Sequence, residues 1–207
     1  MSSTETEAAP APQTPAAPAA TIADPGPLGL AGFAATTFAL SAVNAGLLPK
    51  SIEPVVLPLA LFYGGLAQLL AGMWEFRKNN TFGATAFGSY GAFWLSFAFF
   101  EWQFASEVPE ADSAKAVGLL LLVFTVFTAY MAIASLRTNA ALVAVFVALF
   151  LTFLVLTAGE FTGMDALATG GGALGLLTAV LAWYASFASV LNSTFGTTVL
   201  PVKPLAR

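Results

Sequence analysis

Long apolar segments constrain this chain more than any other feature of its sequence. Hydrophobic residues make up 58% of the 207 residues and charged residues only 9%, whereas a soluble domain carries roughly a quarter charged residues on a surface that faces water. A helix needs about 20 mostly apolar residues to cross the hydrocarbon core of a bilayer. Because several runs of that length follow one another, the sequence predicts an integral membrane protein and not a soluble enzyme.

Six runs are long enough to cross a bilayer as helices. They are Leu28–Leu48, Val55–Trp74, Phe82–Phe104, Ala116–Leu136, Ala140–Ala158 and Gly172–Leu191. Charged residues gather between these runs, and the connections are too short for a soluble domain. Backbone groups inside lipid must pair within the membrane segment, so we expect an all-α domain of six transmembrane helices over residues 25–200.

Two short tails flank the predicted membrane domain. Residues 1–24 are rich in Ala and Pro and bury too little apolar surface to offset the entropy of ordering, which predicts a disordered tail. No basic residue precedes an apolar core there, so we expect no secretory signal peptide. Residues 201–207 form a second, shorter tail.

The distribution of basic residues predicts the orientation in the membrane. Lys and Arg near helix ends favour the cytoplasmic side. Five of them fall on one side, namely Arg77, Lys78, Arg137, Lys203 and Arg207. Only Lys50 and Lys115 fall on the other side. We therefore expect a multi-pass protein of the cell membrane with both termini in the cytoplasm.

Missing residue types exclude several classes of function. The chain has neither Cys nor His, which excludes a disulfide framework, a Cys/His zinc site, the usual haem ligands, and Ser-His or Cys-His catalytic pairs. The seven basic residues are scattered, so no nucleic-acid partner is expected. No cluster of nucleophile, base and metal ligands lies inside the spans. We therefore expect no cofactor, no metal and no enzymatic activity.

Polar side chains inside the predicted spans are candidates for a solute pathway. Thr37 and Asn44 share a stripe with Phe33 on the first span, and Gln68 lies near the middle of the second. Polar groups in hydrocarbon are costly unless they find partners or water, so they rarely face lipid. For Ser and Thr, helix packing is the default explanation. The full amide of Gln68 needs several partners, so a water-filled pathway explains it at least as well.

One charged residue and several glycines have simpler interpretations. Glu75 lies beside Arg77 and Lys78 at a predicted helix end, so we expect it to form an ion pair at the membrane interface. The glycines of the second span, such as Gly64 and Gly72, are expected to allow close helix packing.

Three motifs carry a family resemblance. The first opens the first span and reads Asp24-Pro25-Gly26-Pro27-Leu28-Gly29-Leu30. The second begins with Tyr63-Gly64-Gly65-Leu66-Ala67-Gln68 and ends with Ser89-Tyr90-Gly91-Ala92-Phe93-Trp94. The third is Val190-Leu191-Asn192, followed by Thr198-Val199-Leu200-Pro201. With these motifs the chain closely resembles the acetate/succinate transporter family, the SatP-like acetate permeases of bacteria and fungi, from about residue 24 to 202.

The resemblance implies an architecture and a set of site residues. It implies six helices per subunit, a ring-shaped homohexamer, and a separate monocarboxylate pathway through each subunit. Family members move acetate, and some also move succinate. Their hydrophobic constriction is formed by a Phe, a Tyr and a Leu. These match Phe33, Tyr90 and, in the best register of the fifth span, Leu149.

The entrance motif departs from the family pattern. Asp24 and Gly26 replace the Asn and Ala of the usual Asn-Pro-Ala-Pro, while Pro25 and Pro27 are retained. A carboxylate at the mouth would repel an anion unless it is protonated or hydrogen-bonded to helix N–H groups. The His-Asn of some bacterial members is Val43-Asn44 here, so no His proton carrier is present at that point.

The expected function follows from the charge of the solute. A short carboxylic acid is almost wholly ionised at neutral pH, and its anion enters hydrocarbon only at a large free-energy cost. Hydroxyls, an amide and helix N–H groups lower this cost, and suitable donors are Thr37, Asn44, Gln68, Ser89 and Tyr90. We therefore expect a channel or proton-coupled transporter for acetate, and for succinate or other short carboxylates. The alternatives are a channel for a small neutral solute such as water or ammonia, and a structural or sensory membrane protein.

Overall fold

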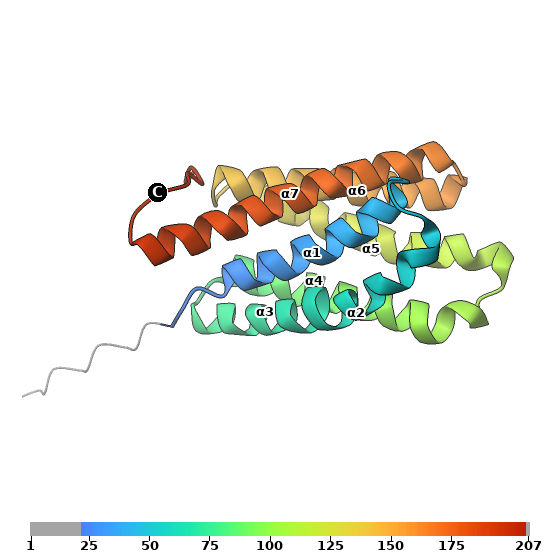
Figure 1. Cartoon of the computed structure of the whole chain (residues 1–207), viewed down its shortest axis with the longest axis horizontal. Coiled ribbons are helices and arrows are strands. Elements are labelled where there is room, and N and C mark those ends of the chain that lie inside the picture. Colours follow the sequence, from blue (N-terminus) through green and yellow to red (C-terminus); the bar gives the residue numbers. More distant parts are fainter. Residues whose placement is uncertain (1–21, 206–207) are drawn as a thin grey trace, which may run out of the picture.

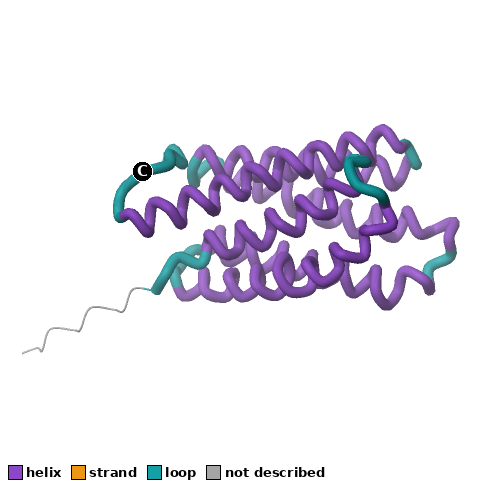
Figure 2. Tube along the Cα trace, in the orientation of Figure 1, coloured by secondary structure: helices purple, strands orange, loops and turns teal. Residues whose placement is uncertain are grey.

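The computed structural model describes residues 22–205 as a bundle of helices whose axes run roughly along its long dimension (Figures 1 and 2). The α-helices are α1 (Gly26–Asn44), α2 (Val56–Leu61), α3 (Gln68–Arg77), α4 (Thr81–Phe99), α5 (Glu110–Ser135), α6 (Ala140–Thr162) and α7 (Asp165–Phe195). The predicted disordered tail falls almost wholly on residues 1–21, which lie outside the described range.

Short non-α segments extend two of these helices. A 3-10 turn (Lys50–Val55), α2, a π-helical segment (Phe62–Ala67) and α3 follow one another without a break. Helix α4 likewise continues into a second π-helical segment, Phe100–Phe104. Within residues 22–205 the chain therefore forms six long helical segments, in the order expected from the six apolar runs.

Five of the six segments in the described range are long and apolar enough to cross a membrane. The segment built on α4 is not among these five, and its helix carries Gly, Ser and Thr between its apolar residues. Ten of the 19 residues of α4 are buried inside the bundle, so about half of this helix faces other helices and not the outside of the protein. Large apolar side chains are exposed on the outside of the bundle, among them Phe62, Phe76 and Ile133. Such a surface suits lipid and not water, and the chain is a multi-pass membrane protein.

Most helices extend beyond the predicted spans. Helix α5 begins at Glu110 and not at Ala116, and α7 runs from Asp165 to Phe195 and not from Gly172 to Leu191. Hydropathy marks the part of a helix that lies in hydrocarbon, whereas backbone hydrogen bonding continues into the polar layer beyond it. The first span is the exception, since α1 ends at Asn44 and Gly46 then turns the chain with a φ of +74°.

Glycines bring the helices of the first half close together. A Cβ atom added to Gly72 of α3 would meet the backbone of Gly88 on α4, and one on Gly32 of α1 would meet the carbonyl of Tyr63. The predicted packing role of the glycine-rich second motif is therefore confirmed for Gly72. In the second half α5 packs against α6 and α6 against α7, and α1 joins the two halves by packing against α7.

The chain returns to the bundle after α7. The Asn192 amide donates to the Leu200 carbonyl at 2.8 Å, and its Oδ1 accepts from Val199 N at 2.7 Å and Leu200 N at 2.9 Å. The N–H of Ala140, at the start of α6, then donates to the Lys203 carbonyl at 2.9 Å. The third sequence motif is thus a structural clamp that fixes residues 199–205 across one end of the bundle.

Candidate functional site

An internal cavity of about 180 Å³ lies between α1, α3, α4, α6 and α7. Its inner wall is mostly apolar and consists of Leu30, Phe33, Gln68, Phe87, Tyr90, Val145, Phe146, Leu149 and Ala185. A concave, mainly apolar space with a few polar groups is the usual form of a small-molecule site. The volume accommodates several water molecules or a small solute.

The three residues matched to the family's constriction meet at this cavity. Phe33 from α1, Tyr90 from α4 and Leu149 from α6 all line it, and each is at most 4% exposed. The ring centroids of Phe33 and Tyr90 are 5.7 Å apart. Three helices thus contribute one large apolar side chain each to the same wall, which is the geometry that a narrow apolar ring requires.

Gln68 lies in the same wall and is 1% exposed. Its Oε1 has no hydrogen-bond partner among the described residues. Gln68 follows directly on the π-helical segment Phe62–Ala67, and π-helical turns frequently occur at functional sites. A buried amide oxygen without a partner is costly, so water or a solute that carries a hydrogen-bond donor is its natural partner.

The mouth of the cavity is formed by the starts of three helices. Its residues include Gly26 at the start of α1, Phe82 and Gly83 at the start of α4, and Leu142 at the start of α6. Helix N-termini carry partial positive charge and N–H groups without helical partners, which favour anions. The partial positive charge of the three N-termini favours a negatively charged group at this end of the cavity. At α6 this contribution comes from the helix dipole alone, because the N–H groups of Ala140, Ala141 and Leu142 already donate to acceptors within the protein.

Asp24 at the mouth is neutralised by its neighbours. Its Oδ1 accepts a hydrogen bond from Gly26 N at 3.0 Å and forms an ion pair with Lys78 Nζ at 2.8 Å. The helix N–H group that was expected to offset its charge is therefore present, and a lysine adds to it. Pro25 and Pro27 serve the start of α1, since the Pro25 carbonyl accepts from Gly29 N and the Pro27 carbonyl accepts from Ser186 Oγ of α7.

The prediction that Glu75 forms an ion pair with Arg77 or Lys78 is wrong, because among the described residues its hydrogen-bond partner is Asn80. Glu75 is 1% exposed, and its Oε2 accepts from the Asn80 amide at 2.8 Å, while Lys78 pairs with Asp24. Asn79 takes a φ of +58° after α3, and Asn80 follows it into contact with Glu75. The Asn80 side chain also accepts from Gly83 N at 3.1 Å and thus caps α4.

Three predicted pathway residues are not among those that line the cavity. Thr37 is 6% exposed on α1, and its Oγ1 has no partner among the described residues. Ser89 is half-buried beside Tyr90, and Asn44 ends α1 at the opposite end from Asp24. Their role in a longer pathway stays a prediction. Among the described residues no group of three or more Asp, Glu, His or Cys could hold a metal ion.

The sequence interpretation missed two polar contacts at this site. Lys78, the partner of Asp24, lies within the long second motif but was assigned to the membrane interface. Thr128 of α5 is fully buried, and its Oγ1 lies 2.9 Å from Tyr90 Oη. The only sequence signal for it is the i, i+3 spacing of Thr125 and Thr128, which places both on one helix face.

These features define a multi-pass helical membrane protein (Figure 1) with a solute-sized internal cavity and an anion-favouring mouth. Residues 7–207 match the family model described as the GPR1/FUN34/yaaH family, and the chain belongs to that family. The resemblance drawn from the sequence motifs is therefore confirmed.

Individual relatives and one solved structure support the same assignment. The chain is 41% identical over 196 residues to "Acetate permease A" of Emericella nidulans, covering 87% of this chain and 66% of that protein. It is 42% identical over 179 residues to "Ammonia transport outward protein 2" of Saccharomyces cerevisiae, covering 84% and 64%. The chain thus spans slightly less than two thirds of these fungal relatives.

A bacterial relative matches over nearly its whole length. The chain is 38% identical over 181 residues to "Succinate-acetate/proton symporter SatP" of Escherichia coli K12, covering 87% of this chain and 95% of that protein. A solved structure described as the bacterial acetate channel SatP matches with a TM-score of 0.82 and 38% identity, over 88% of this chain and 99% of that chain.

Proposed function

We propose that this protein moves acetate and other short carboxylates across the cell membrane through the cavity inside each subunit. The observation that carries the proposal is the combination of three helix N-termini at the mouth with Phe33, Tyr90 and Leu149 in the wall. The names of the E. nidulans and E. coli relatives agree with it.

The chemistry of the cavity matches the two ends of a monocarboxylate. The carboxylate would be stabilised by the helix N-termini and the Gln68 amide, in place of the water it loses on entry. The methyl end would fit the apolar ring, which also excludes bulk water and hence hinders ion leakage when no solute is present. A neutral solute such as ammonia would gain nothing from the three N-termini or from Lys78.

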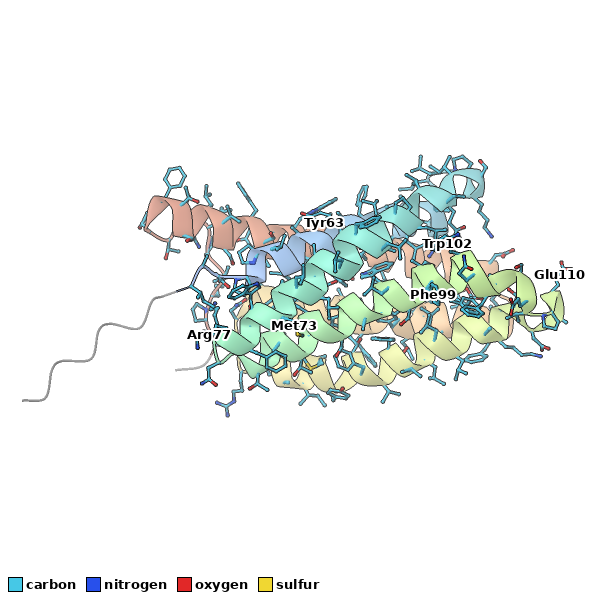
Figure 3. All side chains as sticks on the ribbon, turned by 90° about the horizontal axis from the view of Figure 1, so that it is seen from below. Tyr63, Met73, Arg77, Phe99, Trp102 and Glu110 are labelled. Atoms are coloured by element: carbon cyan, nitrogen blue, oxygen red, sulfur yellow. The ribbon has the colours of Figure 1, made fainter. Side chains whose placement is uncertain are left out.

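The proposal includes a membrane arrangement. The segment built on α4 would cross the bilayer together with the five more apolar segments. Both termini would then be cytoplasmic. Six subunits would form a ring with one pathway in each. The basic bias supports this orientation, since Arg77 lies at one end of the bundle and Glu110 at the other (Figure 3). The exposed apolar side chains would then contact lipid or neighbouring subunits.

Uptake of labelled acetate by purified protein in liposomes tests the function. We expect saturable uptake above that of empty liposomes, and acetate uptake that is faster than uptake of methylammonium, an analogue of ammonium. Imposed gradients distinguish the two modes: a faster initial uptake driven by an outside-acidic pH gradient at zero membrane potential indicates proton coupling, and uptake driven by an inside-positive potential without a pH gradient indicates a channel for the anion. Acetate uptake equal to that of empty liposomes would refute the proposal.

A further inference from the structure

Tyr90 is held in the cavity wall by a ring of aromatic side chains and by one polar contact. It is 3% exposed, and its ring contacts Phe33, Phe127 and Phe153 at centroid distances of 5.7, 5.1 and 6.5 Å. Its hydroxyl lies 2.9 Å from Thr128 Oγ1. Thr128 is 0% exposed on α5 and is not among the residues that line the cavity.

The two hydroxyls share one hydrogen bond, so the donor must be identified. Four of the six other buried threonines of the described bundle donate to the carbonyl four residues earlier. These bonds are Thr36 to Gly32, Thr125 to Leu121, Thr152 to Ala148 and Thr178 to Leu174. Thr128 makes no such bond within the described residues, and Tyr90 Oη is the acceptor within its reach.

The burial of the two residues decides between the two directions of this bond. If Tyr90 donated, the proton of Thr128 would remain without an acceptor at a fully buried position away from the cavity, and such unpaired donors are rare and costly. If Thr128 donates, the unshared proton belongs to Tyr90, which borders a cavity that can hold water or solute. In the second arrangement the unshared donor belongs to the residue that lines the cavity.

We propose that Thr128 is a positioning residue for carboxylate transport, which donates to Tyr90 Oη and so leaves the Tyr90 proton free for the carboxylate in the cavity. The inference rests on the proposed function and adds to it the group that directs the Tyr90 hydroxyl. Thr128 does not touch the solute. Its hydrogen bond occupies a lone pair of Tyr90 Oη and so sets the direction in which the Tyr90 hydroxyl can donate its own proton.

The experiment is a double-mutant cycle between the two residues in liposome acetate uptake. Thr128→Val removes the hydroxyl at nearly constant volume, and Tyr90→Phe removes the donor itself. A hydrogen bond to a charged acceptor is strong enough that either single change should reduce acetate flux roughly ten-fold. Because Thr128 acts through Tyr90, Thr128→Val should cause no further loss in the Tyr90→Phe background. Thr128→Ser keeps the donor and should retain wild-type flux within about two-fold.

A matched control separates positioning from folding. Thr125→Val removes an equally small hydroxyl from the same helix, where Thr125 contacts Thr157 at 3.0 Å and not Tyr90. Its flux per assembled protein should remain near that of the wild type. The inference is overturned if Thr128→Val transports normally, if Thr128→Ser fails as Thr128→Val does, or if the Thr128→Val loss persists in full on the Tyr90→Phe background. Absence of acetate flux in the wild type would instead overturn the proposed function.

Discussion

The substitution Asp24→Asn isolates the electrostatic part of the proposed mouth. Asn retains an oxygen that can accept from Gly26 N, so the start of α1 should be preserved, but the ion pair with Lys78 is lost. Lys78 would then face the cavity as an uncompensated cation. We therefore expect acetate to bind more tightly at the mouth and the apparent KM for its uptake to fall.

The size of this effect follows from the exposure of the pair. The side chains of Lys78 and Asp24 are 31% and 49% exposed, so their surroundings resemble water more than a protein interior. Two unit charges about 4 Å apart interact by about 1 kcal/mol in water and about 4 kcal/mol at an effective dielectric constant of 20. Discounting for solvent screening leaves about 1 kcal/mol, which corresponds to a roughly five-fold lower KM.

The assay is acetate uptake in liposomes at low salt and at an ionic strength of about 1 M, where the Debye length is about 3 Å. The five-fold change in KM should nearly disappear at high salt. Asp112→Asn is the matched control, because Asp112 forms a similar pair with Lys115 at 2.7 Å in the first turns of α5, and neither residue is among those that line the cavity. A KM that is unchanged or raised in Asp24→Asn, in protein with normal thermal stability, would refute the reasoning.

Four further predictions address the rest of the structure. Gln68→Leu should reduce acetate flux at least ten-fold without altering oligomer size in detergent, whereas loss of both flux and assembly would indicate a packing role. Leu149→Ala removes three carbons from the apolar wall and should raise the ratio of succinate to acetate flux, and an unchanged ratio would place the constriction elsewhere. Asn192→Ala removes three hydrogen bonds of the C-terminal clamp and should lower the free energy of unfolding by about 2 kcal/mol, seen as a lower Tm in detergent. Ala111→Cys should react with an impermeant thiol reagent in intact cells and Thr138→Cys should not, since the native chain has no Cys; the reverse pattern would invert the proposed orientation.

The sequence was sufficient for the helical segments and placed four of its candidate pathway residues at the cavity. Apolar runs have the length that a bilayer demands, so the order of the six segments follows from composition alone. Phe33, Gln68, Tyr90 and Leu149 were proposed from helical faces and family motifs, and all four line one cavity. The helix ends were less predictable, because hydropathy reports the hydrocarbon layer and not the extent of backbone hydrogen bonding.

The contacts between distant polar residues could not be predicted in the same way. The pairing of Asp24 with Lys78 joins residues 54 positions apart and depends on how α1 is placed against the end of α3. The bond from Thr128 to Tyr90 likewise depends on the rotation of α5 about its axis. Periodicity identifies the face on which a residue lies, but the choice of partner among several polar groups on neighbouring helices requires the packed structure.

The proposed mouth would lower the free energy of an anion, whereas the proposed apolar ring would raise it. This difference predicts which kinetic constant each mutation changes. In the proposed pathway the helix N-termini would lower the free energy of the anion before it reaches the ring, and Lys78 would add to this once its pair with Asp24 is removed, so changes there should alter occupancy and hence KM. The proposed ring of Phe33, Tyr90 and Leu149 would offer few partners for the carboxylate and would form the barrier, so changes there should alter the maximal rate. Asp24→Asn should therefore move KM at constant maximal rate, and Tyr90→Phe should lower the maximal rate with little change in KM. If both variants changed the same constant in the same proportion, the division of the pathway into an attracting mouth and a rate-limiting ring would be wrong.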